Sequence, residues 1–287
     1  MSHIGILLLR AIGLLPLAWV RALGALLGRL LFATVRGRRH VTLTNLALCF
    51  PQMPEAERRA LARESFIIFA QSWLDRGWLW HAPRAVLEKR LSLHGAEAAL
   101  ADESPLIIFG PHFYGLDAAA TAVTMRSHRR HSSIYTPQSD RVVDAWVKAG
   151  RLRFGDSRVF HRTTGVKEVV QALRSGEVFY LLPDMDFGPD DSLFVPFFGV
   201  PAATLPSLSR FARLGRARVV TILPRLTPQG YTVELLPAWK DFPTADAAAD
   251  TLFMNRQLEA YIATAPAQYW WVHKRFKTRP PGEPPVY

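Results

Sequence analysis

Residues 4–35 form an apolar stretch that three basic residues interrupt, Arg10, Arg21 and Arg29. The longest uncharged run is only about ten residues, whereas a helix that crosses a bilayer needs about 20. On a helix with about 100° per residue, Arg10 and Arg21 lie nearly in line, and Arg29 lies about 80° further round. One polar stripe on an otherwise apolar helix predicts a helix that lies in a membrane interface, or a tilted helix whose arginines reach the headgroups.

The same stretch could also be a secretory signal or a buried core helix. A signal is disfavoured because the stretch is too long and no small-residue cleavage site follows it. The cluster Arg36-Gly37-Arg38-Arg39-His40 follows directly, and basic residues beside an apolar helix favour the anionic, cytoplasmic leaflet. Membrane attachment is therefore preferred to a core helix. We expect residues 1–35 to form the anchor, with Pro16 kinking or dividing the helix.

The rest of the composition is that of a globular protein. The chain has 287 residues, of which 49% are apolar and 21% charged, which excludes a disordered protein. The single cysteine, Cys49, excludes a disulfide scaffold and any zinc or iron–sulfur site built from several cysteines. The formal net charge of +11 fits an anionic membrane, an acidic protein partner or nucleic acid. Nucleic acid is disfavoured because no recognised RNA- or DNA-binding signature is present.

After the anchor, the hydrophobic pattern predicts one long amphipathic helix from Glu55 to Trp80 and then strands that alternate with helices. Strands are expected at 106–109, 132–135, 159–160, 178–182, 219–223 and 231–236, and helices at 116–124, 142–152, 166–173, 207–214 and 245–264. This alternation predicts an α/β domain with a mixed central sheet flanked by helices. Because no long linker divides the remaining chain, residues 36–287 are expected to form a single domain.

His112 is the strongest candidate for a catalytic residue. The apolar run Leu106–Phe109 ends at Gly110-Pro111, His112 stands in the turn, and Asp117 follows at the start of a helical run. Sites in open α/β sheets lie at the carboxyl ends of strands, where this turn would be. A histidine can act as a general base at neutral pH, and a carboxylate on its other ring nitrogen fixes its tautomer. Asp117 can be that carboxylate only if His112 precedes the helix and its ring reaches back over the first turn of the helix.

Further motifs resemble the bacterial lipid A late acyltransferases, within the lysophospholipid acyltransferase-like superfamily. His112 and Asp117 fit the superfamily's His-x4-Asp/Glu motif, although many relatives carry Glu at the second position. The remaining matches follow in the expected order: Val159-Phe160-His161-Arg162, Leu182 to Gly188 with Asp184 and Asp186, Phe194 to Thr204, Ile222-Leu223-Pro224 and Gln268 to Lys277. The last of these is the most specific.

The resemblance implies transfer of an acyl chain from acyl-acyl carrier protein to a hydroxyl of a lipid A precursor, at the cytoplasmic face of the inner membrane. His112 would be the general base, oriented by Asp117, and no cofactor or metal is expected. Arg162, Asp184 and Asp186 are assigned to substrate binding, with positioning of the catalytic loop as the alternative for Asp184. Donors for the tetrahedral oxyanion could come from main-chain N–H groups at the His112 turn or from Arg162.

Three alternatives remain open at the level of sequence. The acceptor could be another membrane glycolipid or a phospholipid, with acyl-CoA as the donor. The chain could also be a non-catalytic lipid-binding member of the fold. Finally, Asp184-Met185-Asp186 could hold a divalent cation as in sugar-nucleotide glycosyltransferases, although such a tripeptide is common by chance.

Overall fold

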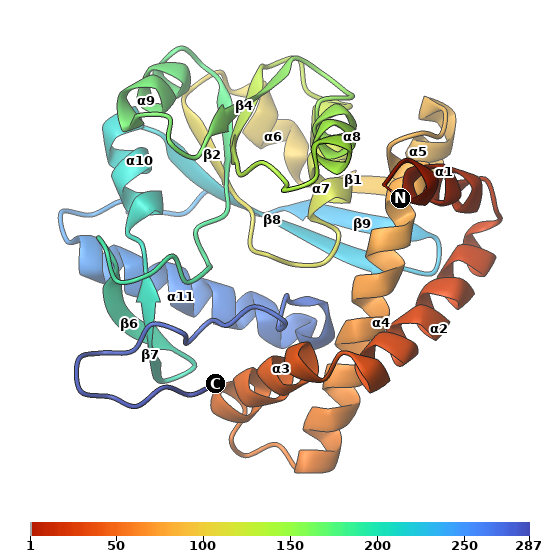
Figure 1. Cartoon of the computed structure of the whole chain (residues 1–287). Coiled ribbons are helices and arrows are strands. Elements are labelled where there is room, and N and C mark those ends of the chain that lie inside the picture. The colour runs from red at the N-terminus through yellow and green to blue at the C-terminus, as the bar shows by residue number, and fades with distance from the viewer. Residues whose placement is uncertain (1) are drawn as a thin grey trace.

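The computed structural model describes residues 2–287, apart from the side chains of residues 96 and 97. A seven-stranded mixed sheet lies at its centre (Figure 1). Its strand order is β1-β9-β8-β2-β5-β3-β4, in which β8 and β9 form an antiparallel hairpin, β1 runs parallel to β9, and the other neighbours are parallel. The strands are β1 (Leu91–His94), β2 (Leu106–Phe109), β3 (His131–Tyr135), β4 (Ser157–His161), β5 (Val178–Leu181), β8 (Arg218–Thr227) and β9 (Gly230–Leu235). The predicted α/β fold with a mixed sheet is therefore confirmed.

Helices cover both faces of the sheet, and the central strand β2 shows why. All four β2 residues are buried; Ile107 and Phe109 belong to one hydrophobic cluster, Leu106 and Ile108 to another. This alternation is that of a strand with a packed face on each side. The first face carries α9 (Val166–Arg174), α10 (Ser207–Gly215) and α11 (Ala247–Thr264), and the second carries α5 (Arg84–Arg90), α6 (Ala96–Ala101), α7 (Leu116–Thr124) and α8 (Arg141–Arg151).

A small hairpin and the C-terminal tail complete the first face. The strands β6 (Leu193–Phe197) and β7 (Val200–Thr204) pair with each other and lie against α11. After α11, a short 3-10 helix, η1 (Pro266–Gln268), leads into the tail. The tail returns across the molecule towards the N-terminal helices (Figure 1).

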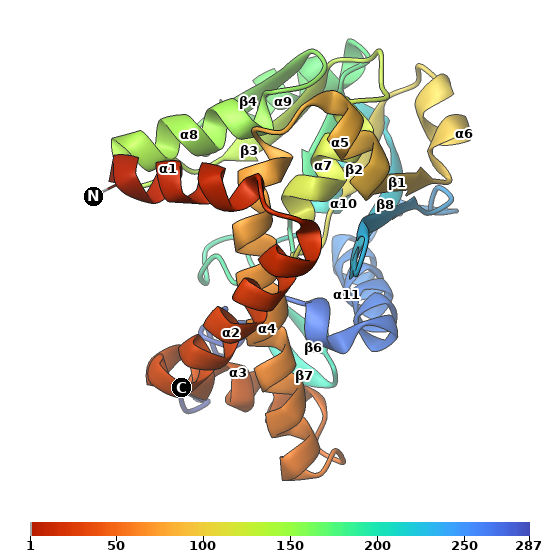
Figure 2. The same cartoon turned by 90° about the vertical axis from the view of Figure 1, so that its right-hand side faces the viewer.

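Four N-terminal helices lie at the side of the sheet (Figure 2). They are α1 (Ser2–Gly13), α2 (Leu17–Thr34), α3 (Arg36–Cys49) and α4 (Glu55–Leu79). The helix expected over residues 55–80 is α4, and Pro16 divides the apolar stretch into two helices. α1, α2 and α3 all contact α4, which is the long helix that connects this group to the sheet.

The helix α2 presents one face to α4 and the opposite face outward. It is long and apolar enough to cross a membrane by length and composition, and 28% of it is buried inside the molecule. Gly24 and Gly28 face α4 so closely that a Cβ on Gly28 would lie 2.4 Å from the Cα of Ile67. Small residues at such positions let two helices approach closely.

One part of the expected polar stripe is wrong. Arg10 and Arg29 are exposed, but Arg21 is buried and forms an ion pair with Asp75 of α4. Its guanidinium also donates a hydrogen bond to the carbonyl of Gly230, 3.3 Å away. The pattern alone could not separate an arginine that faces headgroups from one that faces a buried carboxylate.

Candidate active site

The His112 turn connects the buried strand β2 to the helix α7. Gly115 precedes the helix with φ of 100°, a left-handed conformation that favours glycine. The main chain of the turn is fixed from the tail, because Trp270 N–H donates to the His112 carbonyl (2.9 Å) and Tyr114 N–H donates to the Gln268 carbonyl (2.8 Å). The tail motif therefore holds the turn that carries His112.

The carboxylate that contacts His112 is Asp184. The Nδ1 atom of His112 lies 2.7 Å from Oδ1 of Asp184, and the main-chain N–H of His112 donates to Oδ2 at 2.9 Å. Tyr269 donates its hydroxyl to the same Oδ2 atom at 3.2 Å. Asp184 is fully buried and His112 is partly exposed, so the ring is held from behind and its Nε2 atom remains available as a base.

Electrostatics keep Asp184 ionised despite its burial. Burial opposes the charged form, but the charge of His112 and the hydrogen bonds that His112 donates outweigh it, so the pKa of Asp184 lies below its usual value. Burial and then the charge of Asp184 raise the pKa of Tyr269, which therefore stays a hydroxyl donor. An ionised carboxylate on Nδ1 selects the tautomer in which Nε2 accepts a proton.

The expected contact between His112 and Asp117 is wrong, because Asp117 has other partners. Oδ2 of Asp117 accepts from Arg76 of α4, and Oδ1 accepts from Arg151 of α8, each at 2.9 Å. Burial would raise the pKa of Asp117, but the charges of Arg151 and then Arg76 lower it to about 2. At the start of α7, the side chain thus points to the neighbouring helices rather than back to the turn.

The partly buried Tyr180 is influenced by both carboxylates. Burial, and then the charge of Asp117, raise the pKa of Tyr180, and the charge of Asp184 acts in the same direction. Its hydroxyl is buried and has no hydrogen-bond partner among the described residues. Asp117, Arg76 and Arg151, which we call the Asp117 cluster, are therefore separate from the His112–Asp184 pair, but the charges of Asp117 and Asp184 both act on Tyr180.

Arg162 and Asp186 are the other two residues expected to bind substrate, and neither lines the cavity beside His112. Arg162 is exposed after β4, the edge strand that lies three positions from β2 in the sheet. Asp186 is buried and accepts hydrogen bonds from the main chain of Thr278 (2.7 Å) and from its hydroxyl (2.8 Å). Asp186 therefore ties the loop after β5 to the C-terminal tail.

The side chain of His112 lines a cavity of about 510 Å³, which we call the catalytic cavity. Its other lining residues are mostly apolar and come from the N-terminal helices, the loop after β5 and the tail: Leu31, Val35, Arg38, Phe66, Phe69, Met185, Trp270, Val272 and His273. The ring of Trp270 lies 5.4 Å from that of His112. Such a lining suits an apolar chain next to a proton acceptor.

His273 is a site residue that the sequence did not single out. Its Nε2 atom accepts a hydrogen bond from the main-chain N–H of Asp186 at 3.1 Å, so Nδ1 carries the proton of the neutral ring. Burial, followed by the charges of His112 and Arg275, lowers the pKa of His273 to about 4. A neutral histidine with one fixed donor thus lines the same cavity as His112. Its place in the tail motif was the one signal that could have found it.

The described residues include no activated cysteine nucleophile. Cys49, the only cysteine of the chain, is buried, and burial raises the pKa of its thiol. A thiol that resists ionisation is a poor nucleophile. The arrangement is therefore that of an α/β protein with a histidine–carboxylate pair at the wall of a mostly apolar cavity.

Comparison with known proteins agrees with this class. A family model described as bacterial lipid A biosynthesis acyltransferase matches residues 1–278. The chain is 33% identical to the lipid A biosynthesis lauroyltransferase of Escherichia coli (strain K12), over 100% of this chain and 94% of that protein. It is 31% identical to the lipid A biosynthesis myristoyltransferase of the same strain, over 98% of this chain and 88% of that protein. The chain belongs to the bacterial lipid A biosynthesis acyltransferase family and is an acyltransferase.

Proposed function

We propose that this acyltransferase moves a fatty acyl chain from an acyl-acyl carrier protein to a hydroxyl of a lipid A precursor, with His112 as the general base. The observation that carries the proposal is the His112–Asp184 pair, 2.7 Å apart, at the wall of the apolar catalytic cavity. The names of the similar proteins support the acceptor, because each refers to lipid A biosynthesis.

The chemistry needs no covalent intermediate on the protein. His112 Nε2 removes the proton of the acceptor hydroxyl as its oxygen attacks the thioester carbonyl, and Asp184 stabilises the imidazolium that forms. A tetrahedral oxyanion results. Its collapse breaks the carbon–sulfur bond, forms the ester and returns the proton from His112 to the leaving thiolate.

The oxyanion needs a donor, and the expected sources at the turn are already used. The main-chain N–H groups of residues 112, 113 and 114 donate to Asp184, to the carbonyl of Pro111 and to that of Gln268. We assign the role to Nδ1–H of His273, which is neutral and lines the same cavity. A preorganised neutral donor costs no reorganisation when the charge develops.

The catalytic cavity is the proposed site of the acyl chain. Phe66 and Phe69 of α4 form part of its wall, and Leu31 and Val35 at the end of α2 form another part. Because α2 also carries exposed apolar residues, the cavity lies next to the surface that we assign to the membrane. This placement at the inner membrane, on its cytoplasmic face, suits a lipid acceptor and a soluble acidic donor. The exposed arginines at the start of α3, one of which lines the cavity, would attract that donor.

The test compares three variants with the wild type on acyl-acyl carrier proteins of different chain length and an incompletely acylated lipid A precursor, with mass spectrometry of the product. His112→Ala and Asp184→Asn should each lose about 10²–10⁴ in kcat. Asp156→Asn, which alters an exposed ion pair far along the sheet, should stay near the wild type. Activity of Asp184→Asn close to that of the wild type would disprove the catalytic role of the His112–Asp184 pair.

The His273 role has its own test. His273→Phe removes the donor and should lower kcat by about 10²–10³, while the KM for the acyl donor changes little. His273→Gln keeps an N–H donor and should retain more activity. Equal losses in both variants would mean that His273 only packs.

The acceptor is tested by the same mass spectrometry. If the lipid A precursor gains no acyl mass while another glycolipid does, the proposed acceptor is wrong.

A further inference from the structure

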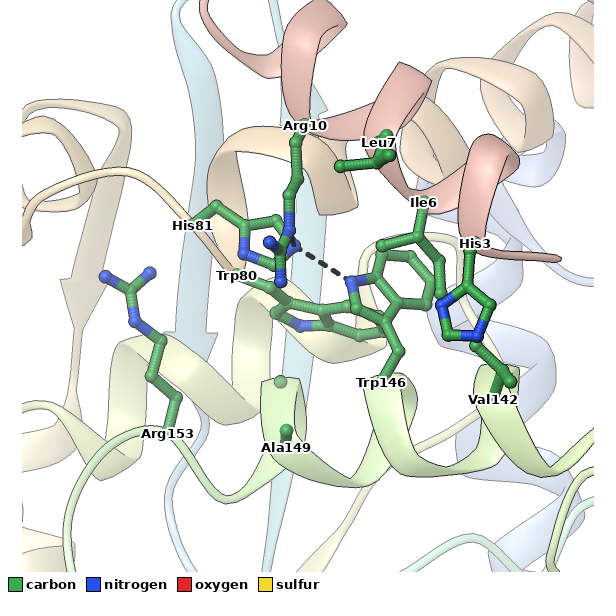
Figure 3. Close-up of a pocket in the computed structure, with 11 residues that line it drawn as sticks. His3, Ile6, Leu7, Arg10, Trp80, His81, Val142, Trp146, Ala149 and Arg153 are labelled. Carbon is green, nitrogen blue, oxygen red and sulfur yellow. Dashed lines mark hydrogen bonds between the residues drawn. The ribbon is translucent and has the colours of Figure 1, made fainter.

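A second cavity lies between α1, the C-terminal end of α4 and α8 (Figure 3). Its volume is about 470 Å³, and we call it the α1–α8 cavity. It shares no lining residue with the catalytic cavity. Phe69 of the catalytic cavity and Trp80 of this one are separated along α4 by about 16 Å of helix. The acyl-transfer chemistry proposed above does not use it.

The α1–α8 cavity is lined by basic and aromatic side chains. Its four ionisable residues are His3, Arg10, His81 and Arg153, and no carboxylate lines it among the described residues. Arg10 and Arg153 have no acidic partner within 4.0 Å in the described part of the chain. Two arginines thus line one cavity without an acidic partner among the described residues, which favours an anionic ligand.

The positions of these groups are fixed by hydrogen bonds. Trp146 Nε1–H donates to Nε2 of His81 at 2.8 Å, and Arg10 Nε–H approaches the same atom at 3.4 Å. The proton of the neutral His81 ring therefore lies on Nδ1, as a further donor. Arg153 is held by hydrogen bonds to the carbonyls of Leu79 (3.0 Å) and Ala82 (2.5 Å).

The remaining wall is apolar and continues to the outside of the molecule. The rings of Trp80 and Trp146 pack edge to face, 4.4 Å apart, and Ile6 and Leu7 of α1 lie opposite (Figure 3). Leu7 is 60% exposed, and its neighbours Ile4 and Leu8 on α1 are exposed to a similar degree. The buried Nε1 of Trp80 has no hydrogen-bond partner among the described residues. Polar donors inside and an apolar rim outside match an amphiphile with an anionic head.

We propose that the α1–α8 cavity binds the phosphate-bearing headgroup of an anionic membrane phospholipid, whose acyl chains leave past Ile6 and Leu7. Guanidinium groups bind phosphate oxygens through charge-assisted and often bidentate hydrogen bonds. The exposed apolar residues beside the cavity favour a lipid over a soluble anion. This site would hold α1 in the membrane interface at a fixed position, independently of the reaction at His112.

The experiment measures binding of a fluorescent short-chain phosphatidylglycerol, below its micellar concentration, to the full chain by polarisation. Arg10→Gln removes one charge, and Ala149→Phe fills the cavity without changing charge. Each should weaken binding at least about tenfold. The matched controls Arg29→Gln and Ala145→Phe change exposed residues of α2 and α8 that do not line the cavity, and should bind as the wild type does. Thermal unfolding confirms that each variant is folded.

Competitors distinguish the sources of phosphate. Phosphatidylglycerol should compete, while phosphatidylcholine and inorganic phosphate should compete at least about tenfold more weakly. Inorganic phosphate that competes as well as the lipid would show a simple anion site and overturn the proposal. Wild-type affinity in both Arg10→Gln and Ala149→Phe would also overturn it. So would displacement of the probe by the lipid A precursor but not by phosphatidylglycerol.

Discussion

A carboxylate orients a histidine ring well when one of its oxygens accepts a hydrogen bond from a ring nitrogen and the other accepts one from a neighbouring group. Asp184 meets both conditions, because its second oxygen accepts from the His112 main chain and from Tyr269. Asp117 does not, since two arginines use both of its oxygens. His112 could be predicted from its place after an apolar strand. Its partner could not, because the two lie 72 residues apart and are joined by strand pairing.

The Asp117 cluster is predicted to stabilise the fold through its charges. Asp117→Asn leaves Arg76 and Arg151 without a carboxylate and should cost about 1.5–3 kcal/mol of the free energy of unfolding. Adding Arg151→Gln should restore part of that loss, because it removes one of the two unpaired charges. Denaturant unfolding of the single and double variants measures this coupling. Strictly additive losses would contradict it.

The lowered pKa values of two buried histidines make the stability of the fold depend on pH. Burial is the main reason that the pKa values of His131 and His273 both fall to about 4. Between about pH 6.5 and pH 4 the unfolded chain then binds more protons than the folded one, so stability falls as the pH is lowered through this range. The thermal midpoint should decrease from pH 7 to pH 4.5, and less so in His131→Gln. A flat profile would show that these rings are protonated in the folded state.

At the scale of elements, the site follows from the register of two strands. Phe109 of β2 pairs with Leu181 of β5, and His112 and Asp184 each follow three residues later. Parallel neighbours therefore bring both side chains to the same edge of the sheet. Both strands were predicted from sequence, at 106–109 and 178–182. Their adjacency was not, because the chain forms β3 and β4 between them and strand order depends on non-local contacts.

Most of the elements that the sequence missed are short or carry proline; the exception is α3, which has 14 residues and no proline. β1 has only four residues, and β6 and β7 contain Pro196 and Pro201, which weaken a strand signal. The longer alternation of strands and helices was predicted correctly, because each of those elements has a clear apolar face. The largest difference in length is at β8, which continues to Thr227 as part of its hairpin with β9.

The contact between α2 and α4 predicts a sensitive glycine. A Cβ at Gly28 would lie 2.4 Å from the Ile67 Cα, so Gly28→Ala should force the helices apart and cost about 1–3 kcal/mol. Because Leu31 and Val35 at the end of the same helix line the catalytic cavity, the KM for the acyl donor should rise as well. Gly5→Ala in α1, where a Cβ meets nothing within 4 Å, is the control and should be neutral or slightly stabilising. Equal effects in both would exclude the packing argument.

At the scale of the whole molecule, one surface gathers most of the exposed apolar side chains. Nine of the fourteen large apolar residues that the described chain exposes lie between residues 4 and 35, on α1 and α2 and at the end of each helix. Both helices lie on the outer side of α4 (Figure 2). The inner face of α2 is packed against α4, which favours a helix that lies in the interface over one that crosses the bilayer alone. The same helix forms part of the catalytic cavity, so under the proposed function attachment and catalysis would share one element.

This surface predicts which substitutions release the protein from a membrane. Replacing Leu14, Trp19 and Leu26 together by serine removes three side chains that are 86%, 66% and 66% exposed, and so should leave the core intact. Each buries apolar area in the interface only when lipid is present, and the loss of all three should lower co-sedimentation with anionic vesicles at least about tenfold. The matched triple variant of Ile134, Val166 and Leu214, which are also exposed but belong to β3, α9 and α10, should sediment as the wild type does. Equal release in the two variants would mean that charge alone holds the protein, and unchanged binding in the first would place the membrane surface elsewhere.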